Sequence, residues 1–323
     1  MGRTSVDVTR LGFGGAPIGN LYREVSEDEA RGAVDVAWDA GIRYFDTAPH
    51  YGLGLSERRL GAALADRPRE EYVLSTKVGR LLAPADGVGD DIEAGGFAVP
   101  ATHRRVWDFS ADGIKRSLES SLDRLGVDRV EIVYLHDPDD HWEQAAFEGF
   151  PALAELRAQG VVGAIGVGMN QWEMPARFVR ETDIDVVMLA GRYTLLEQHA
   201  LPEFLPLCHE RGVSVVAAGV FNSGLLARPD VPQDAKYDYA DAPPELVDRA
   251  SRIAEVCERH GVTLPEVAIQ FPLGHPAVSC VVIGSRTADQ MRANAEHFEV
   301  AVPPPLWEEL RTEGLLGEEV PVP

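Results

Sequence analysis

The chain has 323 residues, enough for one large domain or two ordinary ones, and a single domain of this length is usually a barrel or a doubly wound sheet. Thirty Lys and Arg against 52 Asp and Glu give a formal charge of −22 at pH 7, which repels phosphate backbones and anionic lipid and argues against a nucleic-acid or membrane-surface role. The three cysteines are widely spaced and include no CxxC pair, which excludes a disulfide framework or a thiolate metal site and indicates a reducing compartment.

Residues 1–15 contain no apolar run long enough for a signal peptide, and Val6 stands where a myristoylation pattern requires Ser or Thr. No segment approaches the roughly 18 consecutive apolar residues of a membrane span. We therefore expect a soluble cytoplasmic protein without nucleic-acid or membrane partners.

Eight short apolar runs divide the chain. They are rich in Val and Ile, and their apolar residues follow one another instead of alternating with polar ones. This pattern is typical of strands covered on both faces. They lie at residues 11–15, 43–46, 72–77, 130–136, 161–168, 184–190, 213–218 and 279–284.

Helical patterns lie between these runs. Over residues 30–38, apolar side chains follow the i, i+3, i+4, i+7 stripe of one helix face. Ser26 with Glu29 predicts a capping box at the start of that helix, and Thr287 with Gln290 predicts a capped start for the helix after the last run.

Eight repeats of strand and helix predict an α/β fold, a (β/α)8 TIM barrel that forms one domain over residues 1–323. Two longer stretches, residues 80–110 and 228–244, are rich in Gly, Pro and Asp. Because the strand count continues through both, we interpret them as loops inserted at the C-terminal face of the barrel, where active sites lie.

A dinucleotide-binding Rossmann domain is the main competitor. The stretch GFGGAP at residues 12–17 has two glycines of the GxGxxG fingerprint but Pro17 in place of the third. The fingerprint requires the glycine turn to run directly into a helix, and here the helical pattern starts about ten residues later. The Rossmann interpretation is therefore rejected.

Polar residues occupy the predicted C-terminal strand ends. Asp46, Lys77 and His136 each end a run, and Tyr51 follows five residues after Asp46. Each has an ordinary explanation alone, as a turn former, a surface residue or a loop histidine, but four at one barrel mouth predict a catalytic site. A metal-dependent hydrolase would need several ligands at strand ends, and only Asp46 and His136 qualify, so we expect no metal.

Several motifs carry a family resemblance. They are GIRYFDTAPHYG at residues 41–52, STK at 75–77, YLHDPD at 134–139, AIGVGMN at 164–170 and VIGSR at 282–286. Together they resemble the aldo-keto reductase superfamily. The long stretch after residue 77, the HDPDDH run at 136–141 and GVGMN resemble its aldose 1-dehydrogenase branch, which includes D-threo-aldose (L-fucose), L-galactose and pyridoxal dehydrogenases.

The resemblance implies hydride transfer between a nicotinamide and a carbonyl carbon, with Tyr51 as acid and base. Tyrosine titrates near 10, so work near neutrality requires about 4 kcal/mol in favour of the phenolate. One ammonium at about 4 Å with an effective dielectric constant near 20 supplies about that much, and Lys77 is the candidate. Asp46 then anchors Lys77, and His136 orients the substrate oxygen.

The resemblance also implies a cofactor path. Gly284, Ser285 and Arg286 lead into a helix N-terminus that suits an anion, with Asn294 near the adenine. The residues expected around the pyrophosphate are Asn222, Ser223, Gly224 and Leu225. Those expected near the nicotinamide are Gly15, Ala16, Asp46 and Asn170, and the positions that match the family's amide-binding Ser, Asn and Gln hold Gly168, Met169 and Met188.

Cofactor choice follows from two positions. Many NADPH-preferring relatives place lysine at the position of Gly284 and arginine at that of Gln290, and both charges are missing here. We therefore expect NAD to be preferred, with Arg286 as the residue through which NADP could still bind.

The substrate is expected to be a small sugar or aldehyde, oxidised as a cyclic aldose to a lactone. Trp107 and Trp142, together with Phe109 and Tyr193, are candidates to stack on its ring, although packing explains these aromatics equally well. Asp139, Asp140 and His141 are candidates to bind hydroxyls. The alternatives are a pyridoxal 4-dehydrogenase, a general aldehyde or ketone reductase, and a regulatory subunit that binds nicotinamide without significant turnover.

Overall fold

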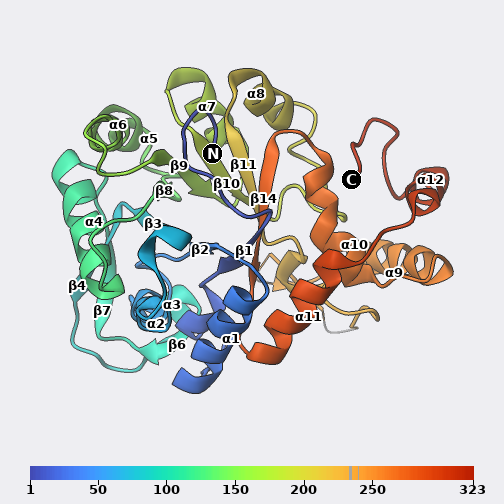
Figure 1. Cartoon of the computed structure of the whole chain (residues 1–323), viewed down its shortest axis with the longest axis horizontal. Coiled ribbons are helices and arrows are strands. Elements are labelled where there is room, and N and C mark those ends of the chain that lie inside the picture. Colours follow the sequence, from blue (N-terminus) through green and yellow to red (C-terminus); the bar gives the residue numbers. More distant parts are fainter. Residues whose placement is uncertain (233–234, 239) are drawn as a thin grey trace.

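The computed structural model describes residues 1–232, 235–238 and 240–323. Eight parallel strands close into a barrel in the order β1-β14-β11-β10-β9-β8-β3-β2 (Figure 1). Each strand overlaps one of the eight predicted runs, so the predicted barrel is confirmed. The strands are β1 (Leu11–Gly14), β2 (Tyr44–Asp46), β3 (Val73–Val78), β8 (Ile132–His136), β9 (Ala164–Met169), β10 (Val186–Ala190), β11 (Ser214–Ala218) and β14 (Val278–Gly284).

Helices surround the barrel (Figure 1). The capping box of Ser26 and Glu29 is present at the start of α1, and the Thr287 hydroxyl accepts the N–H of Gln290 at the start of α11, as predicted. The helices are α1 (Glu27–Asp39), α2 (Leu55–Leu64), α4 (Ala111–Leu125), α5 (Trp142–Gln144), α6 (Phe150–Ala158), α7 (Glu173–Glu181), α8 (Phe204–Arg211), α9 (Pro244–Arg259), α10 (Leu264–Gln270), α11 (Ala288–Glu299) and α12 (Pro304–Thr312).

The stretch at residues 80–110, called the insertion below, is more ordered than the predicted loop. Strands β4 (Arg80–Pro84) and β7 (His103–Trp107) pair antiparallel, as do β5 (Asp90–Asp91) and β6 (Phe97–Pro100), with α3 (Ile92–Gly95) between them. Gly and Pro mark the turns of these hairpins, which is why composition alone suggested a loop.

The second stretch, residues 228–244, contains the short antiparallel pair β12 (Lys236–Tyr237) and β13 (Ala240–Asp241). The predicted loop there also includes residues 233, 234 and 239, which lie outside the described residues. Within the described ranges, no helix has the length and apolar character needed to cross a membrane.

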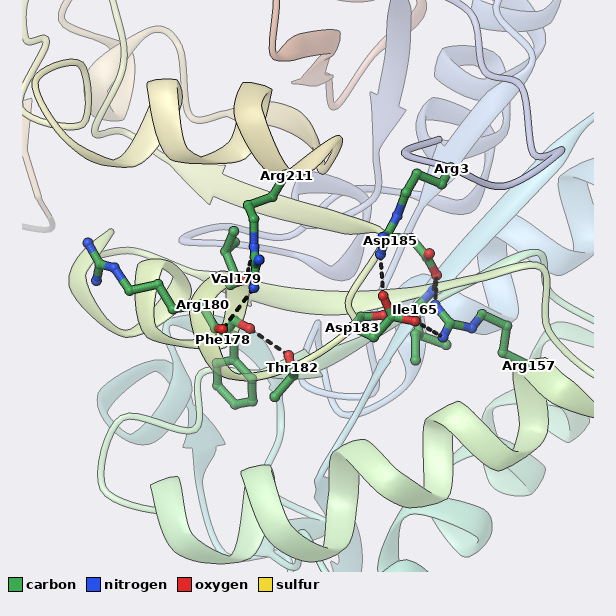
Figure 2. Close-up of polar contacts among 10 residues, drawn as sticks. All are labelled: Arg3, Arg157, Ile165, Phe178, Val179, Arg180, Thr182, Asp183, Asp185 and Arg211. Carbon is green, nitrogen blue, oxygen red and sulfur yellow. Dashed lines mark hydrogen bonds and ion pairs between the residues drawn. The ribbon is translucent and has the colours of Figure 1, made fainter.

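Polar contacts with different degrees of burial lie at the end of the barrel opposite the predicted site (Figure 2). The Asp185 carboxylate, just before β10, accepts Arg157 at 2.7 Å and the backbone N–H of Ile165 at 3.0 Å. Arg3 and Arg157 both pair with the exposed Asp183. The N-terminal strand ends of such barrels serve stability, which suits this arrangement.

Candidate active site

The structure brings together the four polar residues predicted at the strand ends, Asp46, Tyr51, Lys77 and His136, called the tetrad below. The Lys77 ammonium Nζ lies 2.6 Å from Asp46 Oδ2 and 3.0 Å from the Tyr51 hydroxyl, and it also donates to the backbone carbonyl of Thr47 at 3.1 Å. The His136 ring stands edge-on to the Tyr51 ring, with centroids 5.9 Å apart.

Strand register explains why these side chains meet. Asp46 on β2 is opposite Ser75 on β3, and Lys77 on β3 is opposite Tyr134 on β8. Side chains two positions apart on a strand share a face, so Lys77 points the same way as Ser75 and His136 the same way as Tyr134. The tetrad is therefore the top layer of the side chains that fill the barrel.

A chain of hydroxyl groups supports the Asp46 carboxylate from below. The Ser75 hydroxyl donates to Asp46 Oδ1 at 2.7 Å and lies 3.0 Å from the Tyr44 hydroxyl. Tyr44 in turn lies 3.0 Å from the hydroxyl of Tyr134. Because all of these groups are buried, each needs the next as a hydrogen-bond partner, which limits the orientations open to Asp46.

Burial and charge compete in the tetrad. Burial opposes the Lys77 ammonium, but the Asp46 carboxylate and Tyr51 outweigh it and raise the pKa of Lys77. Burial also raises the pKa of Tyr51, against the opposing effect of Lys77. Burial, followed by the charges of Arg80 and Lys77, holds the pKa of His136 well below its usual range. Burial thus opposes the phenolate more strongly than Lys77 favours it, which runs against the expected net lowering of the Tyr51 pKa by Lys77; both shifts favour the neutral phenol and the neutral imidazole.

A cavity of about 810 Å³ opens above the tetrad and is called the central cavity below. Its lining combines the tetrad with small residues of β1 and with α3 and β6 of the insertion. The expected nicotinamide neighbours Gly15, Ala16, Asn170, Gly168, Met169 and Met188 all line it. A Cβ on Gly15 would lie 2.6 Å from the Ser56 hydroxyl and 2.8 Å from the Asp46 carbonyl oxygen, so close packing against α2 and β2 requires glycine there whether or not a cofactor binds.

A second cavity of about 690 Å³, called the lateral cavity, shares Pro17, Leu21, Tyr22 and Gly284 with the central one. Of the residues expected at the pyrophosphate and adenosine, those that line it are Asn222, Ser223, Gly224, Gly284, Arg286, Gln290 and Asn294. Leu225 and Ser285 are buried behind them, and the Ser285 hydroxyl accepts Asn294 Nδ2 at 3.0 Å.

The lateral cavity has polar groups suited to an anionic ligand such as the pyrophosphate part of a dinucleotide. Asn222 Oδ1 and Arg286 Nε are buried and lack hydrogen-bond partners among the described residues. Both residues line the cavity, and Arg286 stands just before α11, whose N-terminus favours negative charge. Gln290 Oε1 accepts the Arg286 backbone N–H at 2.9 Å, and Arg286 Nη2 donates to the Leu21 carbonyl at 3.2 Å.

The aromatic residues expected at the substrate lie elsewhere. Trp107 is 43% exposed and stacks on His141, whereas Trp142 is buried against Phe178. Neither tryptophan is among the described residues that line the central cavity, nor are the buried Phe109 and Tyr193. Trp107 lies in the β4–β7 hairpin, Trp142 packs on Phe178 of α7, and Tyr193 packs on Phe271, so the described lining of the central cavity does not include the expected stacking surface.

The cavity wall holds polar residues that the sequence analysis missed, namely His50, Arg80 and Asp137. Arg105 donates to His50 Nδ1 and makes a two-bonded ion pair with Asp91 at 2.6 Å within the insertion. Each missed residue is within three positions of a tetrad member, and that proximity was the available signal.

Comparisons with known proteins agree with this geometry. The sequence profile of the Aldo/keto reductase family matches residues 10–312. The chain is 50% identical over 309 residues to the D-threo-aldose 1-dehydrogenase of a Pseudomonas species, covering 94% of this chain and 93% of that protein. It is 42% identical to the pyridoxal 4-dehydrogenase of Microbacterium luteolum, covering 98% and 97%. The holo structure of a Bacillus halodurans aldo-keto reductase superposes with a TM-score of 0.75 at 28% identity, covering 99% and 96%.

Proposed function

Because the chain belongs to the aldo/keto reductase family, whose members are NAD(P)-dependent oxidoreductases, we propose that it oxidises the anomeric carbon of a cyclic aldose to a lactone with NAD as the preferred cofactor. The observation that carries the proposal is the Tyr51 hydroxyl held 3.0 Å from Lys77 Nζ at the floor of the central cavity. The 50% identity to a D-threo-aldose 1-dehydrogenase supports the choice of substrate class.

Each tetrad member has a distinct role in this reaction. When bound, the nicotinamide supplies the hydride acceptor for the hydrogen on C1. Tyr51 takes the proton of the anomeric hydroxyl as the C1=O bond of the lactone forms. His136, held neutral by burial, donates a hydrogen bond to the same oxygen and orients it. Lys77 stabilises the Tyr51 oxygen whenever it is deprotonated, and Asp46 keeps the ammonium in place.

The preference for NAD is supported by the charges around the adenosine end. Positions 284 and 290 hold Gly and Gln, so neither brings a cation to a 2′-phosphate. The Gln290 side chain accepts the backbone N–H of Arg286, and the Arg286 guanidinium is bound to the Leu21 carbonyl. A 2′-phosphate would have to draw Arg286 away from that contact.

Pyridoxal is the second candidate substrate, supported by the 42% identity to a pyridoxal 4-dehydrogenase. Its cyclic hemiacetal presents a carbon of the same kind as an aldose C1, and oxidation there also gives a lactone. General aldehyde or ketone reduction would use the same tetrad in the opposite direction.

A panel of aldoses, pyridoxal and simple aldehydes, each with both cofactors, tests the proposal through the ultraviolet absorbance of reduced nicotinamide. We expect the highest kcat/KM for an aldose with NAD+. A higher value for pyridoxal would reassign the substrate, and a strong NADP+ preference would show that Arg286 compensates for the missing cations. Cofactor binding without turnover on any substrate would instead favour the regulatory subunit.

A further inference from the structure

We propose that Arg80 and Asp137 form a recognition pair for the hydroxyl next to the reacting carbon, and that they select polyhydroxylated substrates over their deoxy counterparts. The inference rests on the proposed aldose oxidation and assigns the residues that read the sugar. It replaces the aromatic stacking surface expected from the sequence.

The pair lies at the reacting end of the central cavity. Arg80 Nη2 donates to Asp137 Oδ2 at 2.5 Å, and both residues line the cavity. Their side chains are 11% and 20% exposed, so both are largely shielded from solvent yet open to a ligand. Arg80 follows Lys77 by three residues and Asp137 follows His136 directly, which ties the pair to two strands of the tetrad.

The backbone at Asp137 holds its carboxylate beside His136. Its φ of +41° is in the left-handed region, which is uncommon for residues other than glycine and which aspartate tolerates better than most. The Asp137 N–H donates to the Gly168 carbonyl at 3.0 Å, which locks this turn onto the neighbouring strand β9. As a result, Asp137 Oδ2 lies 3.6 Å from His136 Nε2, next to the position proposed for the substrate oxygen.

Arg80 has donor capacity that the protein leaves unused. A guanidinium carries five N–H donors, and Arg80 Nε is buried without a partner among the described residues. The guanidinium packs over the Trp107 ring, 5.4 Å from its centroid, and Arg80 and Trp107 face each other in the β4–β7 ladder. Trp107 therefore contributes by holding Arg80 rather than by stacking on a substrate.

His50 adds a third fixed group to the same wall. Because Arg105 donates to His50 Nδ1, the proton of the neutral ring is on Nε2. Burial, with the charges of Arg80, Arg105 and Lys77, lowers the pKa of His50 to about 2, so the ring stays neutral. The His50 ring lies 5.6 Å from that of His136, so the wall beside the tetrad offers N–H donors from His50 and Arg80 and an acceptor in Asp137.

This set of groups suits vicinal hydroxyls. A hydroxyl both donates and accepts, so it can bridge the Asp137 carboxylate and the Arg80 guanidinium through charge-assisted hydrogen bonds. A substrate without that hydroxyl would displace water from Arg80 and Asp137 without replacing the hydrogen bonds that the water made. Sites built to bind a hydroxyl discriminate strongly against analogues that lack it.

The test compares D-arabinose with 2-deoxy-D-ribose, which is the same pentose without the C2 hydroxyl. In the unmodified protein we expect kcat/KM to favour D-arabinose by on the order of 10- to 100-fold, the range of one hydrogen bond to a charged group. Arg80→Met, which keeps apolar packing on Trp107, and Asp137→Asn should each lose most of that factor on D-arabinose. On 2-deoxy-D-ribose we expect them to change kcat/KM by less than about threefold.

Arg116→Met is the matched control, because Arg116 forms a similar pair with Asp108, is largely exposed, and is not among the described residues lining the central cavity. It should leave the ratio between the two sugars unchanged. Equal losses on both sugars in the Arg80 and Asp137 variants would mean that the pair only anchors the insertion, which overturns the inference.

Two further outcomes are decisive. Should the variants fail to fold, equal kcat/KM on both sugars in the unmodified protein would by itself refute the inference. Turnover on aldoses without this discrimination leaves the proposed function standing and removes only the recognition pair. Absence of turnover on every aldose removes both.

Discussion

Replacing Lys77 with Met tests whether one buried ammonium makes Tyr51 a usable base. At the observed 3.0 Å and an effective dielectric constant near 20, an ammonium and a phenolate attract each other by about 5.5 kcal/mol. Burial already opposes the phenolate, so no other described cation adjoining Tyr51 replaces this attraction. At about 1.36 kcal/mol per factor of ten, we expect kcat for aldose oxidation to fall by roughly 10³- to 10⁴-fold near neutral pH.

The same substitution leaves Asp46 as a buried carboxylate without its cation, and such a loss costs about 3–5 kcal/mol of folding stability. The double variant Asp46→Asn with Lys77→Met removes both charges and should recover most of that stability. We expect it to unfold in denaturant at a concentration close to that of the unmodified protein while remaining inactive. If the double variant is folded and keeps more than about a tenth of kcat, Lys77 does not activate Tyr51 and the proposed mechanism is wrong.

Three other predictions use the same geometry. Tyr51→Phe should bind NAD as before, measured by fluorescence titration, but lose about 10²- to 10⁴-fold in kcat, and retention of more than a tenth would remove Tyr51 from the mechanism. Burial raises the pKa of Tyr51, so the phenol predominates at neutral pH. Oxidation needs the phenolate and should therefore accelerate as the pH rises into the alkaline range, whereas carbonyl reduction needs the phenol and should slow there. Rates that do not change with pH in either direction would contradict this prediction. Asp185→Ala should cost about 1–3 kcal/mol in denaturant unfolding, because it leaves the buried N–H of Ile165 without its acceptor and removes one of the two carboxylates that bind Arg157. Asp183→Ala at the exposed pair should cost less than about 1 kcal/mol, and equal losses would show that burial does not decide the difference.

Local patterns predicted most of the architecture. A continuous run of β-branched residues marks a strand that is buried on both faces, and the Ser26–Glu29 spacing marks a helix start, because each signal depends only on neighbours along the chain. The alternation of these signals was sufficient to predict a barrel. The fold of the insertion was not predictable in this way, since its hairpins depend on pairing between segments some twenty residues apart.

Some residues of the candidate site could likewise be identified from the sequence, whereas others could be identified only from the fold. Asp46, Lys77 and His136 could be selected from the sequence because strand ends of a (β/α)8 barrel converge at one face whatever the rest of the chain does. The position of Trp107 depends on how the insertion folds, and that of Trp142 on its packing against Phe178 of α7. Arg80 and Asp137 can be recognised as a pair only because the fold brings them into contact. Arg80 belongs to none of the motifs, and although Asp137 lies within the motif at residues 134–139, that motif does not indicate a partner for it, so only contact in three dimensions identifies the pair.

The amino-acid order by itself determined the barrel, the convergence of the tetrad and the family, because periodicity and strand-end chemistry are properties of short segments. The tertiary structure alone decided the direction in which the pKa of Tyr51 shifts and the composition of the cavity wall. Desolvation depends on everything packed around a group, and here it exceeds the attraction of Lys77, a balance between elements that are distant in the chain and adjacent in the folded protein.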